Sequence, residues 1–226
     1  KYLQQRIGVM YPINTHLKSI IDKILTDPRW DMKFIGMQIV IEGLALSAFN
    51  TTRETTPDPV LKDVVYLVTR DEARHVTFGV NYLEEFVQTL SDEERDERAQ
   101  FAYEACVVSR ERLVATDVLR HFGWDVEEAR RKVLDGFVMS TFRNLLFQRV
   151  VPNLGRIGLL TDKIRPNFEE LGILDYENLA TDGDIDWSAL ERPLDVEEAQ
   201  SHEQSMLAAF KEEHEKQETS QASSAA

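Results

Sequence analysis

Glu72 and His75 stand three residues apart in the stretch Arg70–His75, which reads RDEARH. On an α-helix, this spacing puts a carboxylate and an imidazole on one face, one turn from each other. Two side chains placed in this way can hold one metal ion together, and these donor types suit iron or manganese. The pattern alone has little specificity in a chain with 40 acidic residues, so its surroundings must support this interpretation.

The segment around this pattern predicts a helix with one buried side. Between residues 60 and 90 the apolar residues recur at helical spacing and form a stripe, made of Val64, Val65, Val68, Val76, Leu83, Phe86 and Leu90. Glu72 and His75 fall on the same stripe, so we expect both to face the interior. A buried carboxylate is unfavourable unless it has a cationic partner or a metal ion.

A second acid, Glu42, lies thirty residues earlier in the apolar segment Phe34–Phe49. Apart from Glu42, only Gln38 and Ser47 are polar there, and a helix that is apolar all round is a buried helix. The segment is too short to span a membrane, and Glu42 interrupts it. We therefore predict that Glu42 is an acid in the middle of the core.

Helix-end signals place the two acids at a similar level. Asp58 is a predicted N-cap and Pro59 the first residue of the helix that carries Glu72. At 1.5 Å per residue, Glu42 lies about 16 Å from the end of its helix, and Glu72 about 19 Å from the start of the next. If the two helices are antiparallel neighbours, the carboxylates and the histidine converge on a metal site.

Simpler interpretations of the same residues exist. Glu72 could form a buried ion pair with Arg74, and Glu42 could pair with another arginine. His75 could be a core histidine that is held by hydrogen bonds. The shared stripe and the matched level favour the metal site over these alternatives.

The stretches Ile39–Phe49 (IVIEGLALSAF) and Arg70–Gly79 (RDEARHVTFG) resemble the second half of the ferritin-like di-iron carboxylate proteins. That superfamily includes ribonucleotide reductase small subunits, bacterial multicomponent monooxygenase hydroxylases and related ligand-binding oxidases. The resemblance covers roughly residues 2–90. It implies that Glu42 is the lone carboxylate of the third bundle helix, and that Glu72 and His75 form the Glu-x-x-His of the fourth.

The resemblance also implies a function and its cofactors. It implies a non-haem oxidoreductase that holds two iron ions, or a manganese and iron pair, and uses dioxygen, an electron donor and a small, apolar substrate. Asp71 matches an acid that orients the histidine of the other Glu-x-x-His. Alternatives are a metal-storage or ligand-binding bundle without turnover, and a metal-free helical interaction module.

The first Glu and the first Glu-x-x-His of the family pattern are absent here. A site of this type needs four carboxylates and two histidines from four helices, and this chain offers three ligands with the right context. We therefore expect the natural polypeptide to extend before Lys1 and to supply two more helices with the missing donors.

Composition narrows the class of protein. The net charge of −14 argues against nucleic acid or an anionic membrane as a partner, since phosphate binding needs basic patches. A single cysteine, Cys106, rules out an intrachain disulfide and fits a reducing, cytoplasmic location. A homodimer is compatible with these features.

The remaining signals predict an all-α fold: a ferritin-like bundle with additional C-terminal helices. Ser91 is a predicted N-cap for a helix that runs to about Arg120, and a further helix runs from Val126 to Val151, before Pro152. We divide the chain into a bundle with packing helices (1–151), an irregular segment with a polar helix (152–218) and a disordered tail (219–226).

Overall fold

The computed structural model describes residues 2–10 and 12–184, which belong to one compact unit, Lys1–Ile185. Within the described residues, all regular secondary structure is helical, so the predicted all-α fold is confirmed. The predicted polar helix at about 195–217 and the tail at 219–226 lie outside the described residues.

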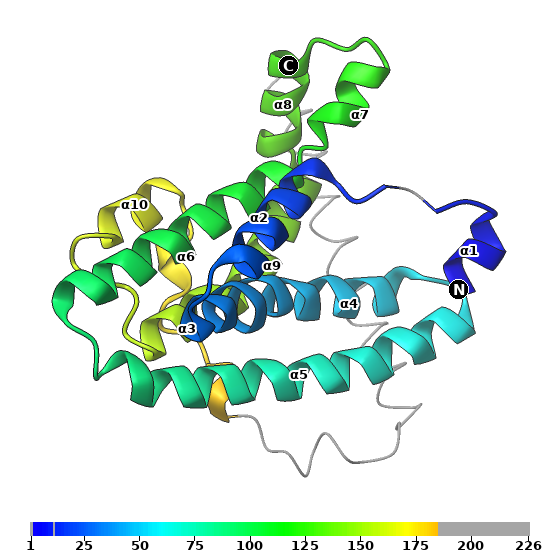
Figure 1. Cartoon of the computed structure of the whole chain (residues 1–226). Helices are drawn as coiled ribbons and strands as arrows, with labels where there is room; N and C mark the ends of the chain where they lie inside the picture. Colours follow the sequence, from blue (N-terminus) through cyan, green and yellow to red (C-terminus); the bar gives the residue numbers. More distant parts are fainter. Residues whose placement is uncertain (1, 11, 185–226) are drawn as a thin grey trace, which may run out of the picture. The chain divides into compact units, whose positions relative to one another are not determined.

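The helices follow one another with short connections (Figure 1). In chain order they are α1 (Tyr2–Ile7), α2 (Thr15–Thr26), α3 (Trp30–Phe34), the π-helical segment η1 (Ile35–Glu42), α4 (Gly43–Thr55), α5 (Pro59–Val87), α6 (Asp92–Arg112), α7 (Thr116–His121), α8 (Val126–Asp135), α9 (Phe137–Arg156), α10 (Arg165–Glu170), and the 3₁₀ turns η2 (Leu174–Tyr176) and η3 (Asp182–Asp184).

The segments α3, η1 and α4 form one continuous helix, Trp30–Thr55, of 26 residues. The helix is longer than the predicted Phe34–Phe49, so the prediction that this segment is too short for a membrane span is wrong. Among the described helices, this one is long and apolar enough to cross a membrane. Half of its apolar window is buried inside the protein, however, and the core helix of a soluble protein meets the same criterion.

A three-residue turn joins this helix to α5, and the two run side by side in opposite directions (Figure 1). The predicted cap is confirmed: the Asp58 carboxylate accepts hydrogen bonds from the backbone N–H groups of Val60 and Leu61, and Pro59 begins the helix. A carboxylate at this position satisfies N–H groups that have no partner within the helix.

Contacts between the two helices fix their antiparallel register. The rings of Trp30 and Phe86 lie 4.5 Å apart, and Arg53 lies over the Tyr66 ring at 4.6 Å, near the opposite end. Between these ends, Gly79 lies directly against Gln38. Residue numbers therefore increase along the first helix in the direction in which they decrease along α5.

Helix α6 begins with the predicted cap at Ser91, which forms a capping box with Glu94. It packs on α2 and η1, and its buried residues include Cys106. Burial raises the pKa of the Cys106 thiol to about 12, so it is an unreactive core residue.

Two predicted helix boundaries are wrong. The helix from Ser91 ends at Arg112 rather than Arg120, because Ala115 adopts a left-handed conformation, with φ 50°, between α6 and α7. The helix predicted over 126–151 is broken at Gly136, and its second part, α9, continues through Pro152 to Arg156. A continuous helix therefore crosses residues 151 and 152, where the sequence suggests a boundary between segments.

The last described segment is held to the bundle by the buried carboxylate of Asp182. It accepts hydrogen bonds from Arg149 at 2.6 Å and Asn153 at 2.7 Å, both on α9. Thr77 of α5 donates to the Asp182 backbone carbonyl at 2.8 Å. These contacts fix η3 against both helices.

Candidate metal centre

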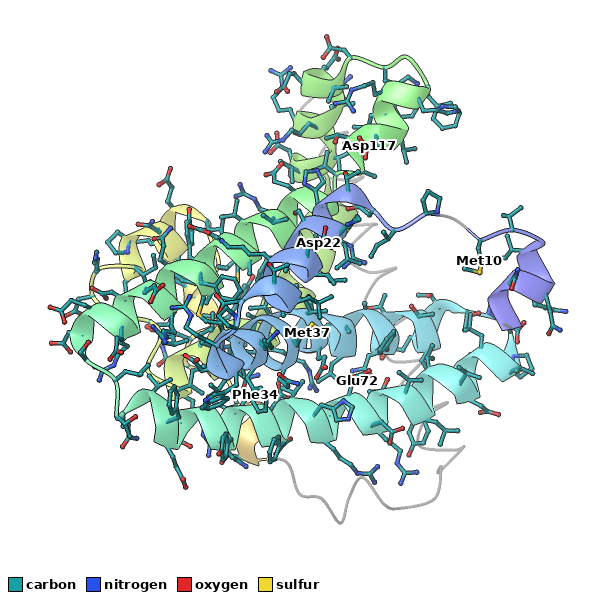
Figure 2. All side chains as sticks on the ribbon, in the orientation of Figure 1. Met10, Asp22, Phe34, Met37, Glu72 and Asp117 are labelled. Carbon is teal, nitrogen blue, oxygen red and sulfur yellow. The ribbon has the colours of Figure 1, made fainter. Side chains whose placement is uncertain are left out.

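The three predicted ligands lie together where η1 meets α5. Glu42 is the last residue of η1. Glu72 lies on α5, on the side of that helix that faces α4 (Figure 2). His75 Nδ1 lies 3.2 Å from Glu72 Oε2 and 3.9 Å from Glu42 Oε2. One ligand atom from each residue can be chosen so that all three lie within 4.8 Å of one another.

The π-helical segment explains why Glu42 points to α5. In a regular α-helix, residues eleven apart lie on one face, because eleven residues make about three turns. Asp31 and Glu42 have this spacing, yet Asp31 bonds to Arg98 on α6 while Glu42 faces α5. The i→i+5 hydrogen bonds of a π-helix add about one residue per turn, which rotates Glu42 away from the face of Asp31.

Burial decreases across the site. The side chains of Glu42 and Glu72 are 14% and 24% exposed, whereas His75 is 58% exposed. The prediction that His75 lies on the buried stripe is therefore wrong. Val64 of that stripe is exposed as well, while Ala73 and Val80 are buried, so the buried face of α5 is rotated relative to the prediction.

The outer face of α5 is apolar as well. Its exposed members, here called the α5 stripe, follow one another at helical spacing and are each 42–55% exposed: Val60, Val64, Leu67, Phe78 and Tyr82. Asp71 and His75 fill the middle of the same face. Exposed apolar residues on both sides of Asp71 and His75 are typical of a surface that another element covers.

The electrostatics of the site are unfavourable for Glu42. Burial raises the pKa of Glu42 above its usual value, the neighbouring Glu72 carboxylate raises it further, and His75 opposes the shift. Two carboxylates near one another repel when both are ionised. In the described residues, the partner with a positive charge nearest to this pair is His75, and only when it is protonated.

The site fits a metal ion by geometry and by donor chemistry. Glu42 Oε2 is buried and has no hydrogen-bond partner, so an acceptor is left facing the site. Bonds of about 2.2 Å to one ion put opposite ligands about 4.4 Å apart, close to the 4.8 Å that bounds this cluster. A small movement of the exposed His75 would close the set around one ion.

Asp71 lies beside the cluster but does not contact it in the described structure. Its carboxylate accepts a hydrogen bond from Arg74 at 3.0 Å and is 68% exposed. The suggested ion pair between Glu72 and Arg74 is not observed, because Arg74 is paired with Asp71. The predicted role of Asp71, orienting a further histidine, stays a prediction.

Gln38 and Gly79 lie one turn from the ligands, and the sequence reasoning does not identify them as functional. A Cβ at Gly79 would meet the Gln38 Cβ at 2.6 Å, so glycine is what allows this close approach. Gln38 Oε1 is buried without a hydrogen-bond partner. The signal in the sequence is a polar residue four positions before Glu42 in an otherwise apolar helix.

No family model matches the chain, and no curated protein or solved structure matches it either. The resemblance to ferritin-like di-iron proteins therefore rests on the motifs themselves, and the function must be argued from the site.

Proposed function

We propose that the chain is part of a non-haem di-iron oxidoreductase of the ferritin-like type, which activates dioxygen to oxidise a small substrate. The observation that carries this proposal is the buried Oε2 atom of Glu42, which has no hydrogen-bond partner in the described structure and lies with Glu72 and His75 in one cluster of possible ligands. Carboxylates and an imidazole on adjacent helices are the donors that such bundles use for two metal ions. Iron is the favoured metal, and a manganese and iron pair is the alternative.

The roles of the three residues follow from their positions. Glu42 and Glu72 would hold the metal as bridging or terminal carboxylates, and His75 would be a terminal ligand to one ion. Bound iron would supply electrons for the reduction of dioxygen. Burial and Glu72 raise the pKa of Glu42, and metal binding would oppose this shift because a metal ion binds the ionised carboxylate.

The described residues provide half of the donors that a di-metal site needs. We propose that the other donors come from helices that lie against the α5 stripe, where exposed apolar residues flank His75 on both sides. Covering this stripe would bury His75 and exclude water from the ligands. Asp71, in the middle of the same face, would then meet the histidine of a second Glu-x-x-His.

The exposure of His75 supports one second candidate, a metal-storage or ligand-binding bundle without turnover. A histidine that is 58% exposed leaves the ion accessible for exchange, which suits storage more than oxygen chemistry. The two candidates differ in one measurable quantity, the amount of dioxygen consumed per iron during repeated reduction.

The experiment compares the complete natural protein with its His75→Ala variant after anaerobic addition of Fe²⁺. We expect the unsubstituted protein to bind iron and to consume dioxygen when a reductant is supplied. His75→Ala should bind iron at least about 100-fold more weakly, since it loses a direct ligand and even a supporting partner is worth up to about this much. Its helical content should be unchanged, because His75 is largely exposed.

His121→Ala is the matched control, because His121 is also exposed but lies on α7, away from the site. Elemental analysis gives the iron content, an oxygen electrode gives turnover, and circular dichroism gives helical content. Equal iron binding by all three proteins would contradict the proposal. Iron binding without repeated oxygen consumption would favour storage.

A further inference from the structure

A polar side chain that the predicted ligand set does not use lies next to the site. Gln38 is four residues before Glu42, and Gly79 is four residues after His75. Because the two helices are antiparallel, the contact of Gln38 with Gly79 forms the layer directly next to the layer of Glu42 and His75. The Gln38 side chain therefore enters the gap between η1 and α5 beside the ligands.

Gln38 can lie close to α5 because the facing residue on α5, Gly79, has no side chain. Gly79 would meet Gln38 Cβ at 2.6 Å and Cγ at 3.1 Å if it carried a Cβ. The Cβ and Cγ atoms of Gln38 thus pack against the α5 backbone at Gly79. This packing restricts the side chain more at these atoms than at its terminal amide group. A side chain held in this way is suited to orient a group, because little rotational freedom is left to lose.

The amide group has an unmet hydrogen-bonding need. Gln38 Oε1 is buried and has no hydrogen-bond partner, and the same is true of Glu42 Oε2 on the next turn. Buried polar atoms in native proteins almost always have partners, so an orphan atom requires an explanation. Two buried acceptors without partners, four residues apart on the helix that packs on α5, would be satisfied by a cation and a hydrogen-bond donor between the helices.

We propose that Gln38 is a positioning residue of the metal site: its amide oxygen accepts a hydrogen bond from a water molecule bound to the metal that Glu42 holds. This inference rests on the proposed metal site and extends it by one residue. A metal ion polarises the O–H bonds of its water ligand, which makes that water a strong donor. A buried amide oxygen is a matching acceptor that adds no charge to a site already rich in carboxylates.

The opposite orientation of the Gln38 amide group leads to a different prediction. The oxygen and nitrogen of an amide are assigned from their surroundings. With the amide turned over, Gln38 would donate an N–H to Glu42 Oε2 and stabilise that carboxylate, without contacting a bound water. Replacement by glutamate separates the two cases, because an ionised carboxylate keeps the acceptor atoms and has no donor.

The test compares Gln38→Met and Gln38→Glu with the unsubstituted protein. Met keeps the unbranched stem that lies against Gly79 and removes the polar end. Isothermal titration with Co²⁺ alone gives the affinity, and the visible absorption of bound Co²⁺ reports its coordination. We expect Gln38→Met to bind Co²⁺ about 10–100-fold more weakly, as for the loss of other supporting partners of metal sites, and Gln38→Glu to keep its affinity.

The melting temperature without metal provides a second readout with the opposite sign. Gln38→Met removes an orphan acceptor from the interior, so the metal-free variant should melt at a higher temperature than the unsubstituted protein. Gln100→Met is the matched control, since Gln100 is exposed on α6 and bonds only to Glu104 among the described contacts. If Gln38→Met does not fold, Gln38→Ala takes its place.

Each outcome decides between the interpretations. Equal Co²⁺ affinity in all variants would show that Gln38 only packs against Gly79, and the inference would be wrong. Weaker binding by both Gln38→Met and Gln38→Glu would show that the amide donates to Glu42, which also overturns it. A failure of the unsubstituted protein to bind Co²⁺ would instead contradict the proposed metal site itself.

Discussion

Asp31 and Glu42 lie on the same continuous helix, but within the described residues only Asp31 has an arginine partner. Asp31 is 3% exposed, and its carboxylate accepts a hydrogen bond from Arg98 Nε at 2.8 Å. Glu42, eleven residues later, faces a second carboxylate, and its Oε2 has no hydrogen-bond partner. The structure supplies an arginine where an acid holds helices together, and supplies none where the acid faces Glu72.

The buried acid of the last segment follows the first pattern. Asp182 is 6% exposed and is bound by Arg149 and Asn153. Glu42 thus differs from the other two buried acids compared here. Burial alone therefore does not distinguish Glu42 from these acids, whereas the lack of a hydrogen-bonded arginine among the described residues does.

The largest effect on the free energy of unfolding should follow from removing the carboxylate of Asp31, the acid that is paired with Arg98. Asp31→Ala removes the buried partner of the Arg98 guanidinium, which is 6% exposed, and leaves the half-exposed Glu97 as the remaining ion-pair partner among the described residues. Loss of one member of a buried ion pair costs about 3–5 kcal/mol, and we expect a decrease of this size in the free energy of unfolding. Urea denaturation followed by circular dichroism measures it. A loss below about 1 kcal/mol would show that Arg98 finds other partners and that the comparison is not valid.

The unpaired acid should respond in the opposite direction. Glu42→Gln removes a carboxylate whose pKa is raised by burial and by Glu72, so the metal-free protein should be unchanged or more stable by up to about 1 kcal/mol at pH 7. The same variant should lose metal binding. Destabilisation comparable to that of Asp31→Ala would mean that Glu42 has a structural partner.

The pH dependence of stability has a defined sign at Glu42. Because the pKa of Glu42 is raised in the folded state, the folded protein holds this proton more tightly than the unfolded chain does. The contribution of Glu42 to the stability of the metal-free protein is therefore fully present below the ordinary pKa of about 4.5, and it is lost as the pH rises through the raised pKa. The difference in unfolding free energy between Glu42→Gln and the unsubstituted protein should grow over that interval.

The smallest effect on stability is expected at the α5 stripe. Leu67→Ser changes a side chain of this stripe that is 52% exposed, so the free energy of unfolding should change by no more than about 0.5 kcal/mol. Self-association, measured by sedimentation velocity, should decrease because an exposed apolar surface is reduced. Leu83→Ser, on the buried face of α5, is the control and should be strongly destabilising. Equal destabilisation by both variants would show that Leu67 belongs to the core.

Local signals in the sequence predict the ends of α5 and α6 well. Asp58 and Ser91 cap their helices as predicted, because capping depends on residues within one turn. The left-handed residue at 115 is an alanine, which carries no such signal, and Pro152 lies inside α9 although proline usually ends a helix. The break at Ala115 and the continuation of α9 through Pro152 therefore do not follow from the residue types at these positions.

The candidate site shows the same limit. The spacing of Glu72 and His75 and the matched level of Glu42 depend only on helix geometry, and the structure brings these three residues together. The exposure of His75 could not be predicted, because it depends on which elements cover α5. The pairing of Asp31 with Arg98 links residues 67 positions apart, and the same sequence pattern would allow that arginine to neutralise Glu42 instead.

The π-helical segment η1 has a consequence for the kinds of genetic change that the protein can tolerate. Because η1 sets the rotation between Asp31 and Glu42, the loss of a single codon within Ile35–Glu42 would turn everything beyond it by about 100°, the angle of one residue in an α-helix. The reading frame would be kept, and the composition would change by one residue. Glu42 would nevertheless leave the face of α5 while Asp31 stayed on Arg98, so the number of residues between Asp31 and Glu42 is as much a part of the site as its ligands.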